Sequence, residues 1–406
     1  MKKVVVIDNL TETFKGSIVR SGLQKSSKLD ARAFAKMGYN THFIYAGECK
    51  DEYKYKHHVV DELGSKDRAM AEGKNPSRVS RYYIKAYLEK VQDVLKDADY
   101  IIAHCHSVSM ITLVNSLVKN KRIMFVIHDV IDLMWCYGTS DVIRRMRKTD
   151  RNMCYVATNS NYSIQRMTDI HLRAIAAKYP ETPMPGNEAF DGYIEHFVWT
   201  DEIVTDKDIM TVENKSAIIG RYESSKFHHK VYGYQNPENV IVHYGIRDPR
   251  RDEKGKYYDK LVKSANAYAE NLADADLFKA IKSSKSIILP CHHEGFGYTA
   301  FEAGIYGVVP VIFQRQLEHL GVWAHATSEY LTRANVKHFV ADFNSADDIY
   351  KAIDESITVT LEDRYEISRN LLNYFRVENY VNERIQKLDS IKERVSTQVD
   401  LEDFFV

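Results

Sequence analysis

The sequence predicts an α/β protein made of two Rossmann-like domains, each built on a parallel sheet. Ten short runs rich in β-branched residues recur along the 406 residues, and segments with helical spacing of apolar residues lie between them. Apolar strands that alternate with amphipathic helices are typical of parallel sheets covered on both faces. The segment 178–215 is rich in proline, glycine and acidic residues, and it divides the strands into two groups of about five.

The first half of the chain alternates between strand and helix. Residues 80–98 show the helical pattern, because their apolar side chains recur every three or four positions. Five strands are expected here, at 4–8, 41–46, 100–105, 123–129 and 155–160.

The second half repeats this alternation and then becomes helical. Its strands are expected at 217–221, 239–245, 286–291, 309–313 and 337–342. After about residue 345 only helical patterns continue. We therefore expect a first domain at 1–200, a second domain at 201–345 and a helical segment at 346–406. If the domains face each other across a cleft, a ligand would lie at the carboxyl ends of the strands.

The composition argues against a membrane protein and against an overall field that attracts polyanions. The chain carries 56 basic and 56 acidic residues, which leaves room only for a local basic patch. Five cysteines show no C-x-x-C spacing, which fits a reducing compartment. The start, MKKVVVIDNL, has too few apolar residues for a signal peptide, and no window approaches a membrane span. We expect a soluble cytoplasmic protein.

The stretch 290–313 combines a glycine-rich turn, two carboxylates and a helix. Gly295 and Gly297 allow backbone amides to approach a ligand closely, and the helix start offers N–H groups to an anion. Glu294 precedes the glycines and Glu302 lies about one and a half turns into the helix, so both can meet hydroxyl groups. An anion flanked by two polyols is the layout of a nucleotide sugar. The simpler interpretation is that both glutamates are solvated helix charges.

The letters GFGYTA at 295–300 also satisfy the dinucleotide fingerprint G-x-G-x-x-G/A. That fingerprint normally occupies the first strand, turn and helix of its domain, whereas here it follows the third expected strand of the second domain. The position therefore favours a nucleotide sugar. A Rossmann-type NAD-binding oxidoreductase is the alternative from another functional class.

A second cluster follows the strand 217–221. Gly220 and Arg221 end that strand, and Lys226 follows five residues later in a loop. Two cations that converge on a diphosphate would neutralise a departing nucleoside diphosphate without a metal ion. The simpler interpretation is a pair of surface charges.

The two clusters together resemble the donor site of retaining GT-B glycosyltransferases of the glycogen-synthase and sucrose-synthase kind. The shared pattern is Gly-Arg-x4-Lys, followed about seventy residues later by EGFGYTAFEAGIYGVVPVI. The chain departs from it at Phe227, where the family usually has glycine, and at the CHH of 291–293, where it usually has a small serine-type residue. The resemblance implies the donor-binding residues Gly16, Gly220, Glu294, Gly295, Phe296, Gly297, Tyr298, Thr299 and Glu302.

The resemblance also implies roles. Arg221 and Lys226 would grip the diphosphate, while the two glutamates would meet the donor sugar and the ribose. In the first domain, His128 and Asp129 end the strand 123–129, where similar enzymes carry a histidine near the donor sugar. Asp129 would orient this histidine or take a proton from the acceptor hydroxyl. The alternative is a histidine that merely caps its strand.

No residue pattern indicates a metal site. The adjacent histidines and the HCH of 104–106 lack the spacing of a closed ligand set. The DAD of 274–276 lies in a stretch, 267–281, that we expect to be helical. We expect no metal and no cofactor beyond the nucleotide-sugar co-substrate.

Among GT-B enzymes, the chain is most similar to the α-type phage DNA glucosyltransferases that modify 5-hydroxymethylcytosine. There too a histidine–aspartate strand end is followed by a basic helix. Basic side chains in a neutral protein would contact the phosphate backbone of DNA. The simpler interpretation is a solvated helix face. The run DVIRRMRKTDR would supply the acceptor-binding residues Arg144, Arg145, Arg147, Lys148 and Arg151.

These patterns predict a retaining, metal-independent glycosyltransferase that moves a sugar, by default from UDP-glucose, to an acceptor hydroxyl. The expected partners are the nucleoside-diphosphate sugar and double-stranded DNA with modified bases, in the host cytoplasm if the protein is of phage origin. The alternative within this class is a glycan, lipid or small-molecule acceptor.

Overall fold

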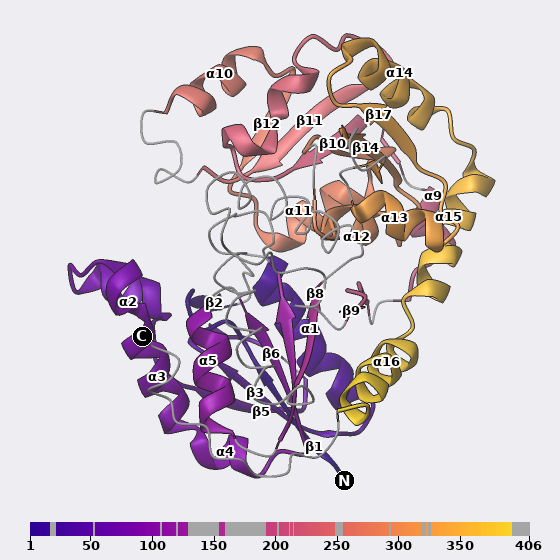
Figure 1. The fold of residues 1–406 in the computed structure, drawn as a ribbon. Helices are drawn as coiled ribbons and strands as arrows, with labels where there is room; N and C mark the ends of the chain where they lie inside the picture. The colour runs from indigo at the N-terminus through magenta and orange to yellow at the C-terminus, as the bar shows by residue number, and fades with distance from the viewer. Residues whose placement is uncertain are drawn as a thin grey trace. The chain divides into compact units, whose positions relative to one another are not determined.

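A computed structural model gives the fold (Figure 1). Its described residues form two compact units. Unit 1 comprises Met1–Phe197 and Val377–Val406, and unit 2 comprises Val198–Arg376. The described residues are 1–16, 22–51, 53–105, 108–118, 121–128, 154–158, 192–200, 203–210, 212–213, 215–247, 255–291, 294–317, 322–323 and 326–391.

Unit 1 is built on a parallel sheet. Its described strands run in the order β5-β3-β1-β6-β7-β8-β9, and each neighbouring pair is parallel. The central strands β1 and β6 are almost wholly buried, which explains why their sequences are continuous apolar runs. The bounds are β1 Lys3–Ile7, β3 Asn40–Tyr45, β5 Lys56–Val59, β6 Tyr100–Cys105, β7 Arg122–Ile127, β8 Cys154–Thr158 and β9 Gly192–Tyr193. A separate parallel pair joins β2 Phe14–Gly16 and β4 Gly47–Cys49.

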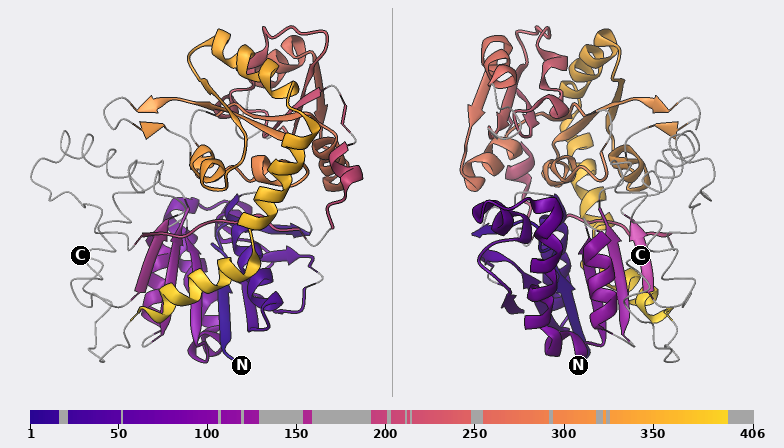
Figure 2. Two further views of the ribbon diagram at one scale, coloured as in Figure 1. Left: turned by 90° about the vertical axis from the view of Figure 1, so that its right-hand side faces the viewer. Right: turned by 60° about the vertical axis from the view of Figure 1, so that its left-hand side comes forward.

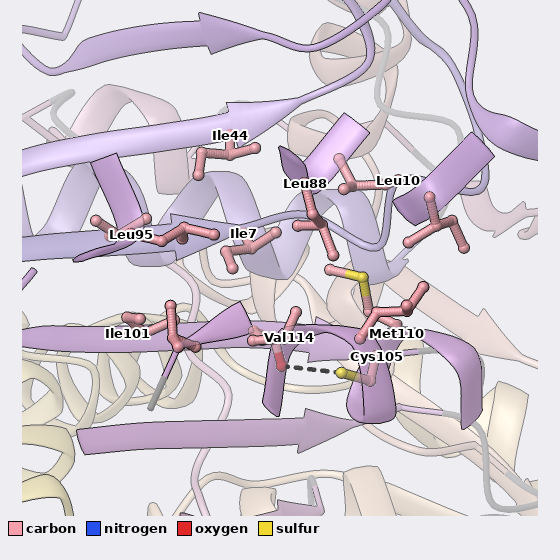
Figure 3. Packing of buried hydrophobic residues seen from close by; sticks show 14 of the residues in the cluster. Ile7, Leu10, Ile44, Leu88, Leu95, Ile101, Cys105, Met110 and Val114 are labelled. Atoms are coloured by element: carbon pink, nitrogen blue, oxygen red, sulfur yellow. Dashed lines mark hydrogen bonds between the residues drawn. The ribbon is translucent and has the colours of Figure 1, made fainter. Parts of the chain in front are cut away.

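Helices bury the apolar side chains of this sheet. Leu88 of α3 and Met110 and Val114 of α5 belong to one fully buried cluster with Ile7 and Ile101 of the central strands (Figure 3). Removing this apolar surface from water stabilises unit 1. The helices of this part of the chain are α1 Gly22–Lys36, α2 Ser65–Ala71, α3 Pro76–Lys90, α4 Gln92–Lys96 and α5 Val108–Leu117.

The C-terminal helix α16, Val377–Asp389, also belongs to unit 1 (Figure 2). It packs against α1, β7 and β8. The carboxylate of Asp389 accepts hydrogen bonds from the Tyr100 hydroxyl at 2.6 Å and from Arg122 Nη1 at 2.5 Å. These contacts attach α16 to the first residues of β6 and β7. The helices after residue 345 are therefore divided between the two units.

Unit 2 is built on a second parallel sheet. Its described strands run in the order β12-β11-β10-β13-β14-β17, again with parallel neighbours. The bounds are β10 Lys215–Ile219, β11 Val240–Gly245, β12 Ala267–Glu270, β13 Ser286–Leu289, β14 Val309–Gln314 and β17 Phe339–Asp342. A short antiparallel pair joins β15 Gln316–Leu317 and β16 Val322–Trp323.

The two faces of this sheet are covered by different helices. Ile287 of β13 packs with the small side chains of α12, whereas the next residue, Ile288, packs with the apolar side chains of α14. Successive side chains of a strand point to opposite faces, so α12 and α14 cover opposite sides. The helices are α9 Asp206–Met210, η3 Ser224–Lys226, η4 His228–Val231, α10 Lys256–Ser264, α11 Asp274–Lys282, α12 Tyr298–Gly304, α13 Ala326–Arg333, α14 Ala346–Ile357 and α15 Leu361–Tyr374.

All ten strands expected from the sequence are present, with small shifts at their ends. The expectation of one helix over 267–281 is wrong, because β12 occupies 267–270 and only α11 is helical. The sequence analysis also missed β5, whose residues are Lys-His-His-Val. Both strands lie at sheet edges and are largely exposed or half-buried, so they lack the apolar run that marks a central strand.

Candidate functional site

The candidate site lies in unit 2, at the carboxyl ends of two neighbouring strands. β10 and β13 are adjacent and parallel, with Ile218 opposite Ile288. The loops that follow them therefore leave the sheet at the same edge. These loops, 220–227 and 290–297, contain Gly220, Arg221, Lys226, Glu294, Gly295, Phe296 and Gly297.

Lys226 and Glu294 connect the two loops. The Lys226 Nζ lies 3.9 Å from Oε2 of Glu294, and the two side chains are 31% and 30% exposed. The other carboxylate oxygen of Glu294 accepts a hydrogen bond from the backbone N–H of Gly295 at 3.2 Å. One carboxylate thus faces an ammonium group and a backbone amide. Both are donors that also suit a phosphate oxygen.

Gly220 lies against the side chain of Lys226. A Cβ added at Gly220 would lie 3.5 Å from Lys226 Cγ, so the lysine stem rests in van der Waals contact with this position. Gly245, at the end of β11, is more restricted. A Cβ there would lie 1.9 Å from the Gly220 carbonyl oxygen, closer than any side chain tolerates. The backbone that carries Gly220 is therefore supported from the neighbouring strand.

Phe227 has a left-handed backbone conformation at the position where the resemblance has glycine. Its φ of 52° and ψ of 28° lie in the left-handed region, which costs about 1–2 kcal/mol for a residue with a side chain. The ring packs edge-on against Phe343, with 4.9 Å between centroids, beside the core of unit 2. The Phe227 side chain is partly buried, and this burial offsets part of the strain.

Arg221 is paired within its own loop. Its Nη2 lies 3.2 Å from Oε1 of Glu223, whose side chain is 5% exposed, whereas that of Arg221 is 34% exposed. A guanidinium group has five N–H donors, so one carboxylate leaves capacity for a second anion. The buried glutamate thus anchors an arginine that solvent can reach.

The charged form of Lys226 is favoured by its neighbours. The pKa of Lys226 is raised, because the Cys291 thiolate and the Glu294 carboxylate stabilise the ammonium against the opposing effect of burial. Burial raises the pKa of the Cys291 thiol to about 11. This thiol is therefore neutral near pH 7, where the carboxylates of Glu294 and Glu223 are the neighbouring groups that favour the charged form of Lys226.

The turn before α12 requires glycine. Gly297 has a φ of 80° and a ψ of 55°, and a Cβ at this position would lie 2.3 Å from Thr327 Oγ1. That hydroxyl donates a hydrogen bond to the Phe296 carbonyl oxygen at 2.7 Å. Tyr298 and Thr299 are the first two residues of α12, and both are half-buried. The glycine lets α12 start in contact with α13.

Phe296 and Glu302 have different surroundings. The Phe296 side chain is buried, stacks on Phe301 at 4.4 Å between centroids and meets Tyr330 edge-on at 5.0 Å. It therefore anchors the turn in the core, and only its backbone belongs to the loop surface. Glu302 lies in the second turn of α12 and is half-buried.

Unit 1 contains the remaining predicted residues. Gly16 ends β2 and pairs with Cys49 of β4. His128 directly follows β7, where its Nε2 lies 2.8 Å from Nδ1 of His104 and its ring centroid lies 5.0 Å from that of His196. The predicted residues outside the described part of the chain are Asp129, Arg144, Arg145, Arg147, Lys148 and Arg151.

The described residues contain neither a candidate metal cluster nor a candidate membrane-spanning helix. No group of three or more His, Cys, Asp or Glu side chains there is arranged to hold a metal ion. No helix in that part of the chain is long and apolar enough to cross a membrane.

Sequence reasoning missed several residues that shape these sites. Glu223 holds Arg221 in place and Gly245 supports Gly220, but nothing in the sequence distinguishes either from other residues in loops and at strand ends. His104 stands out in the sequence only as part of HCH, and Asp30 belongs to no motif. An acidic residue on the apolar face of a helix, as Asp30 is on α1, was the available signal, because such a residue needs a buried partner.

No protein-family model matches the sequence, and no curated protein matches it. Solved structures do match. The sucrose-phosphate synthase of Thermosynechococcus elongatus has a TM-score of 0.61 at 11% identity, over 95% of this chain and 98% of that one. HepE of Anabaena, solved with UDP and glucose, has a TM-score of 0.63 at 12% identity, over 96% and 100%.

A third match is an α,α-trehalose-phosphate synthase (UDP-forming) from Burkholderia vietnamiensis. Its TM-score is 0.61 at 11% identity, over 96% of this chain and 97% of that one. The chain has the GT-B fold. Because the likeness extends over nearly the whole length of each chain, it includes both parallel sheets.

Proposed function

We propose that this GT-B protein is a glycosyltransferase that takes its sugar from a nucleoside-diphosphate sugar, by default UDP-glucose. The main support is the arrangement of Lys226, Glu294 and the Gly295 amide at the carboxyl ends of β10 and β13. Among proteins with similar structures, HepE was solved with UDP-glucose, at a TM-score of 0.62 and 11% identity. The sequence pattern at both loops supports the same donor chemistry.

In the proposed complex, the diphosphate replaces the Glu294 carboxylate beside Lys226 and the Gly295 N–H. Arg221 supplies a second cation while Glu223 holds its position. Charge collects on the leaving diphosphate as the sugar–phosphate bond loosens, so fixed cations lower the barrier by stabilising that charge. Neither step needs a metal ion. The acceptor would approach from the face that the leaving group occupies, which gives retention of configuration.

The other donor-site residues have supporting roles in this proposal. Gly220 and Gly297 let the backbone approach the ligand, and Tyr298 and Thr299 present the first amides of α12. The displaced Glu294 meets the donor sugar, while Glu302 accepts hydrogen bonds from the ribose hydroxyls. Phe296 contributes through its backbone. The proposed division is an acceptor-side domain at 1–200, containing Gly16 and His128, a donor domain at 201–345 and a helical segment at 346–406.

For the acceptor we propose 5-hydroxymethylcytosine in double-stranded DNA. The support is the sequence resemblance and the basic run that begins at Arg144. Replacing Arg144, Arg145 and Arg147 together by glutamine is expected to weaken DNA binding and flatten its salt dependence, without changing the affinity for UDP. Mass spectrometry of nucleosides, after incubation of hydroxymethylated DNA with a panel of nucleotide sugars, identifies the product. A glycan or small molecule that is glycosylated instead would overturn this choice.

The experiment for the donor site compares Lys226→Ala with Lys215→Ala. Lys215 lies at the other end of β10 and pairs with Glu213 at 2.8 Å, so it is a matched control on the same strand. We expect Lys226→Ala to lower turnover by roughly 10²–10³-fold, with a smaller loss of donor affinity. Equal turnover in the two variants would overturn the donor site. A thermal shift with NAD but not with UDP, GDP or ADP would favour an oxidoreductase.

A further inference from the structure

A buried chain of hydrogen bonds reaches His128 from the interior of unit 1. The Asp30 carboxylate on α1 lies 2.9 Å from Nε2 of His104, and Nδ1 of His104 lies 2.8 Å from Nε2 of His128. Asp30 and His104 are fully buried. On its other side, Asp30 faces the buried Arg384 of α16, with 2.7 Å between Oδ1 and Nε.

The sheet topology explains why these groups meet. His104 is near the end of β6 and His128 follows the end of β7, two neighbouring parallel strands. The backbone N–H of His128 donates to the Cys105 carbonyl oxygen at 3.4 Å. Strand ends that lie side by side bring the two imidazoles together with 5.1 Å between ring centroids. α1 packs on the same strand β6 and delivers Asp30.

The charges around Asp30 keep it ionised. The pKa of Asp30 is lowered, because the attraction of Arg384 and the hydrogen bond from His104 outweigh the effect of burial. An ionised carboxylate has no proton to donate, so His104 must carry a proton on Nε2. In the neutral His104, Nδ1 is then an acceptor, and it takes the Nε2 proton of His128. A neutral His128 therefore has its lone pair on Nδ1.

We propose that His104 is a positioning residue that fixes the tautomer of His128, so that Nδ1 of His128 accepts a hydrogen bond from a substrate hydroxyl group. This inference rests on the proposed glycosyltransferase function for the identity of that hydroxyl, which belongs to a sugar or to the acceptor. We call the hydrogen bonds from Asp30 through His104 to His128 the relay. A neutral imidazole in water populates both tautomers, so His128 would have no fixed tautomer without the relay. A fixed tautomer keeps the hydrogen-bond acceptor on one ring nitrogen, as in catalytic sites where a carboxylate orients a histidine.

The other groups around the relay are consistent with a neutral, oriented His128. His196 stacks on it, and burial lowers the pKa of His196 to about 3, so this neighbour carries no charge. The Nδ1 of His196 lies 2.9 Å from the Ser26 hydroxyl. Arg384 lies against the Tyr380 ring, at 3.3 Å from its centroid, and donates through Nη2 to the Glu195 carbonyl oxygen. Asp30 thus contacts His104 directly, and Arg384 is linked to His104 through Asp30.

The experiment measures the tautomer of His128 directly, by NMR of ¹⁵N-labelled histidines in the full chain. The signal is assigned by its loss in His128→Gln. His104→Gln keeps a donor and an acceptor at the spacing of the ring nitrogens, whereas His104→Phe keeps only a ring. A matched control is His42→Gln, which alters another buried histidine, 2.8 Å from a second histidine, on β3 of the same sheet.

We expect His128 to carry its proton on Nε2 in the parent, in His104→Gln and in the control, and to populate both tautomers in His104→Phe. We also expect kcat to fall about tenfold in His104→Phe and by less than threefold in His104→Gln. A parent His128 protonated on Nδ1, or an unchanged tautomer in His104→Phe, would overturn the inference. If His104→Phe does not fold, the parent spectrum alone still shows whether His128 carries its proton on Nε2 or on Nδ1.

Failure of the proposed function gives a different result. If the parent transfers no sugar from any nucleotide sugar but shows the expected tautomers, the glycosyltransferase assignment fails and the relay stands. If transfer is normal and the tautomer of His128 does not depend on His104, the relay fails and the assignment stands.

Discussion

At the scale of single residues, Glu294 has two competing roles. Its carboxylate faces Lys226 and the Gly295 amide, the groups that we assign to a diphosphate. A nucleotide can use these groups only after that carboxylate has moved. The negative charge that would hold a sugar hydroxyl therefore also opposes the binding of the phosphates.

Replacing Glu294 by glutamine separates these roles. Glutamine keeps the shape but removes the negative charge, so UDP no longer competes with a carboxylate for Lys226. We expect Glu294→Gln to bind UDP about 3–10-fold more tightly, since the charge is partly solvated and its effect is about 1 kcal/mol, while turnover of the nucleotide sugar falls. Calorimetric titration with UDP measures the first effect. Weaker UDP binding in the variant would show that Glu294 does not compete for the anion site.

Asp8 is a second residue whose negative charge is unfavourable in its surroundings. It is fully buried, and burial raises the pKa of its carboxyl group to about 7. The folded protein then binds a proton that the unfolded chain has lost, so stability falls as pH rises from about 4 to about 7, by up to about 4 kcal/mol. Asp8→Asn can keep the hydrogen bond from the Ser27 hydroxyl, which is 2.7 Å in the parent.

We therefore expect the Asp8→Asn variant to be more stable than the parent at pH 8, and to gain less at pH 5. Denaturant unfolding at the two pH values measures this difference. An equal gain at both would mean that Asp8 titrates near its ordinary pKa in the folded protein.

At the scale of elements, the turn that starts α12 is a point where the backbone determines the site. Gly297→Ala adds a left-handed strain of about 1–2 kcal/mol and a contact with Thr327. Gly38→Ala is the matched control, because Gly38 also has a φ of 80° but nothing lies within 4 Å of its added Cβ. We expect a larger loss of unfolding free energy for Gly297→Ala, together with loss of the thermal shift caused by UDP. Equal losses would mean that the contact relaxes without cost.

The sequence predicted the central strands and the glycine turn for related reasons. Strands such as β1 and β13 are buried on both faces, so their composition reports their position. The left-handed backbone conformation of Gly297 depends only on its immediate neighbours in sequence, and glycine is the residue that usually adopts it. Edge strands have no comparable pattern in the sequence, and a buried pair of charged residues does not show there which residues are paired. The position of Asp30 on the buried face of α1 indicates that it needs a buried partner, but nothing in the sequence identifies the distant Arg384 as that partner.

At the scale of each whole unit, buried histidines limit stability in acid. Burial lowers the pKa of His228 to about 3 and that of His243 to about 4, and the two rings meet at 3.0 Å between their Nδ1 atoms. Below about pH 6.5 these two histidines become protonated in the unfolded chain but stay neutral in the folded unit 2. The free energy of unfolding therefore falls as the pH falls from about 6.5 towards 4. At pH 5 each histidine accounts for about 2 kcal/mol.

We expect unit 2 to lose about 4 kcal/mol between pH 7 and pH 5 from this pair, a large part of an ordinary folding free energy. His243→Gln should remove roughly half of that loss. Hydrogen exchange of the β10 and β11 amides at both pH values measures it within unit 2. Unchanged protection at pH 5 would mean that the pair accepts a proton without unfolding.

The place of α16 in unit 1 also determines when that unit can be completed during synthesis. Tyr100 and Asp389 are 289 residues apart, and the whole of unit 2 is translated between them. At about 5–20 residues per second, the ribosome takes roughly 15–60 s to cover that distance. Throughout this interval the nascent chain holds Asp30 without Arg384 and leaves the surface that α16 covers exposed to water or to chaperones. Unit 1 is therefore the first unit whose synthesis begins and the last whose synthesis is completed.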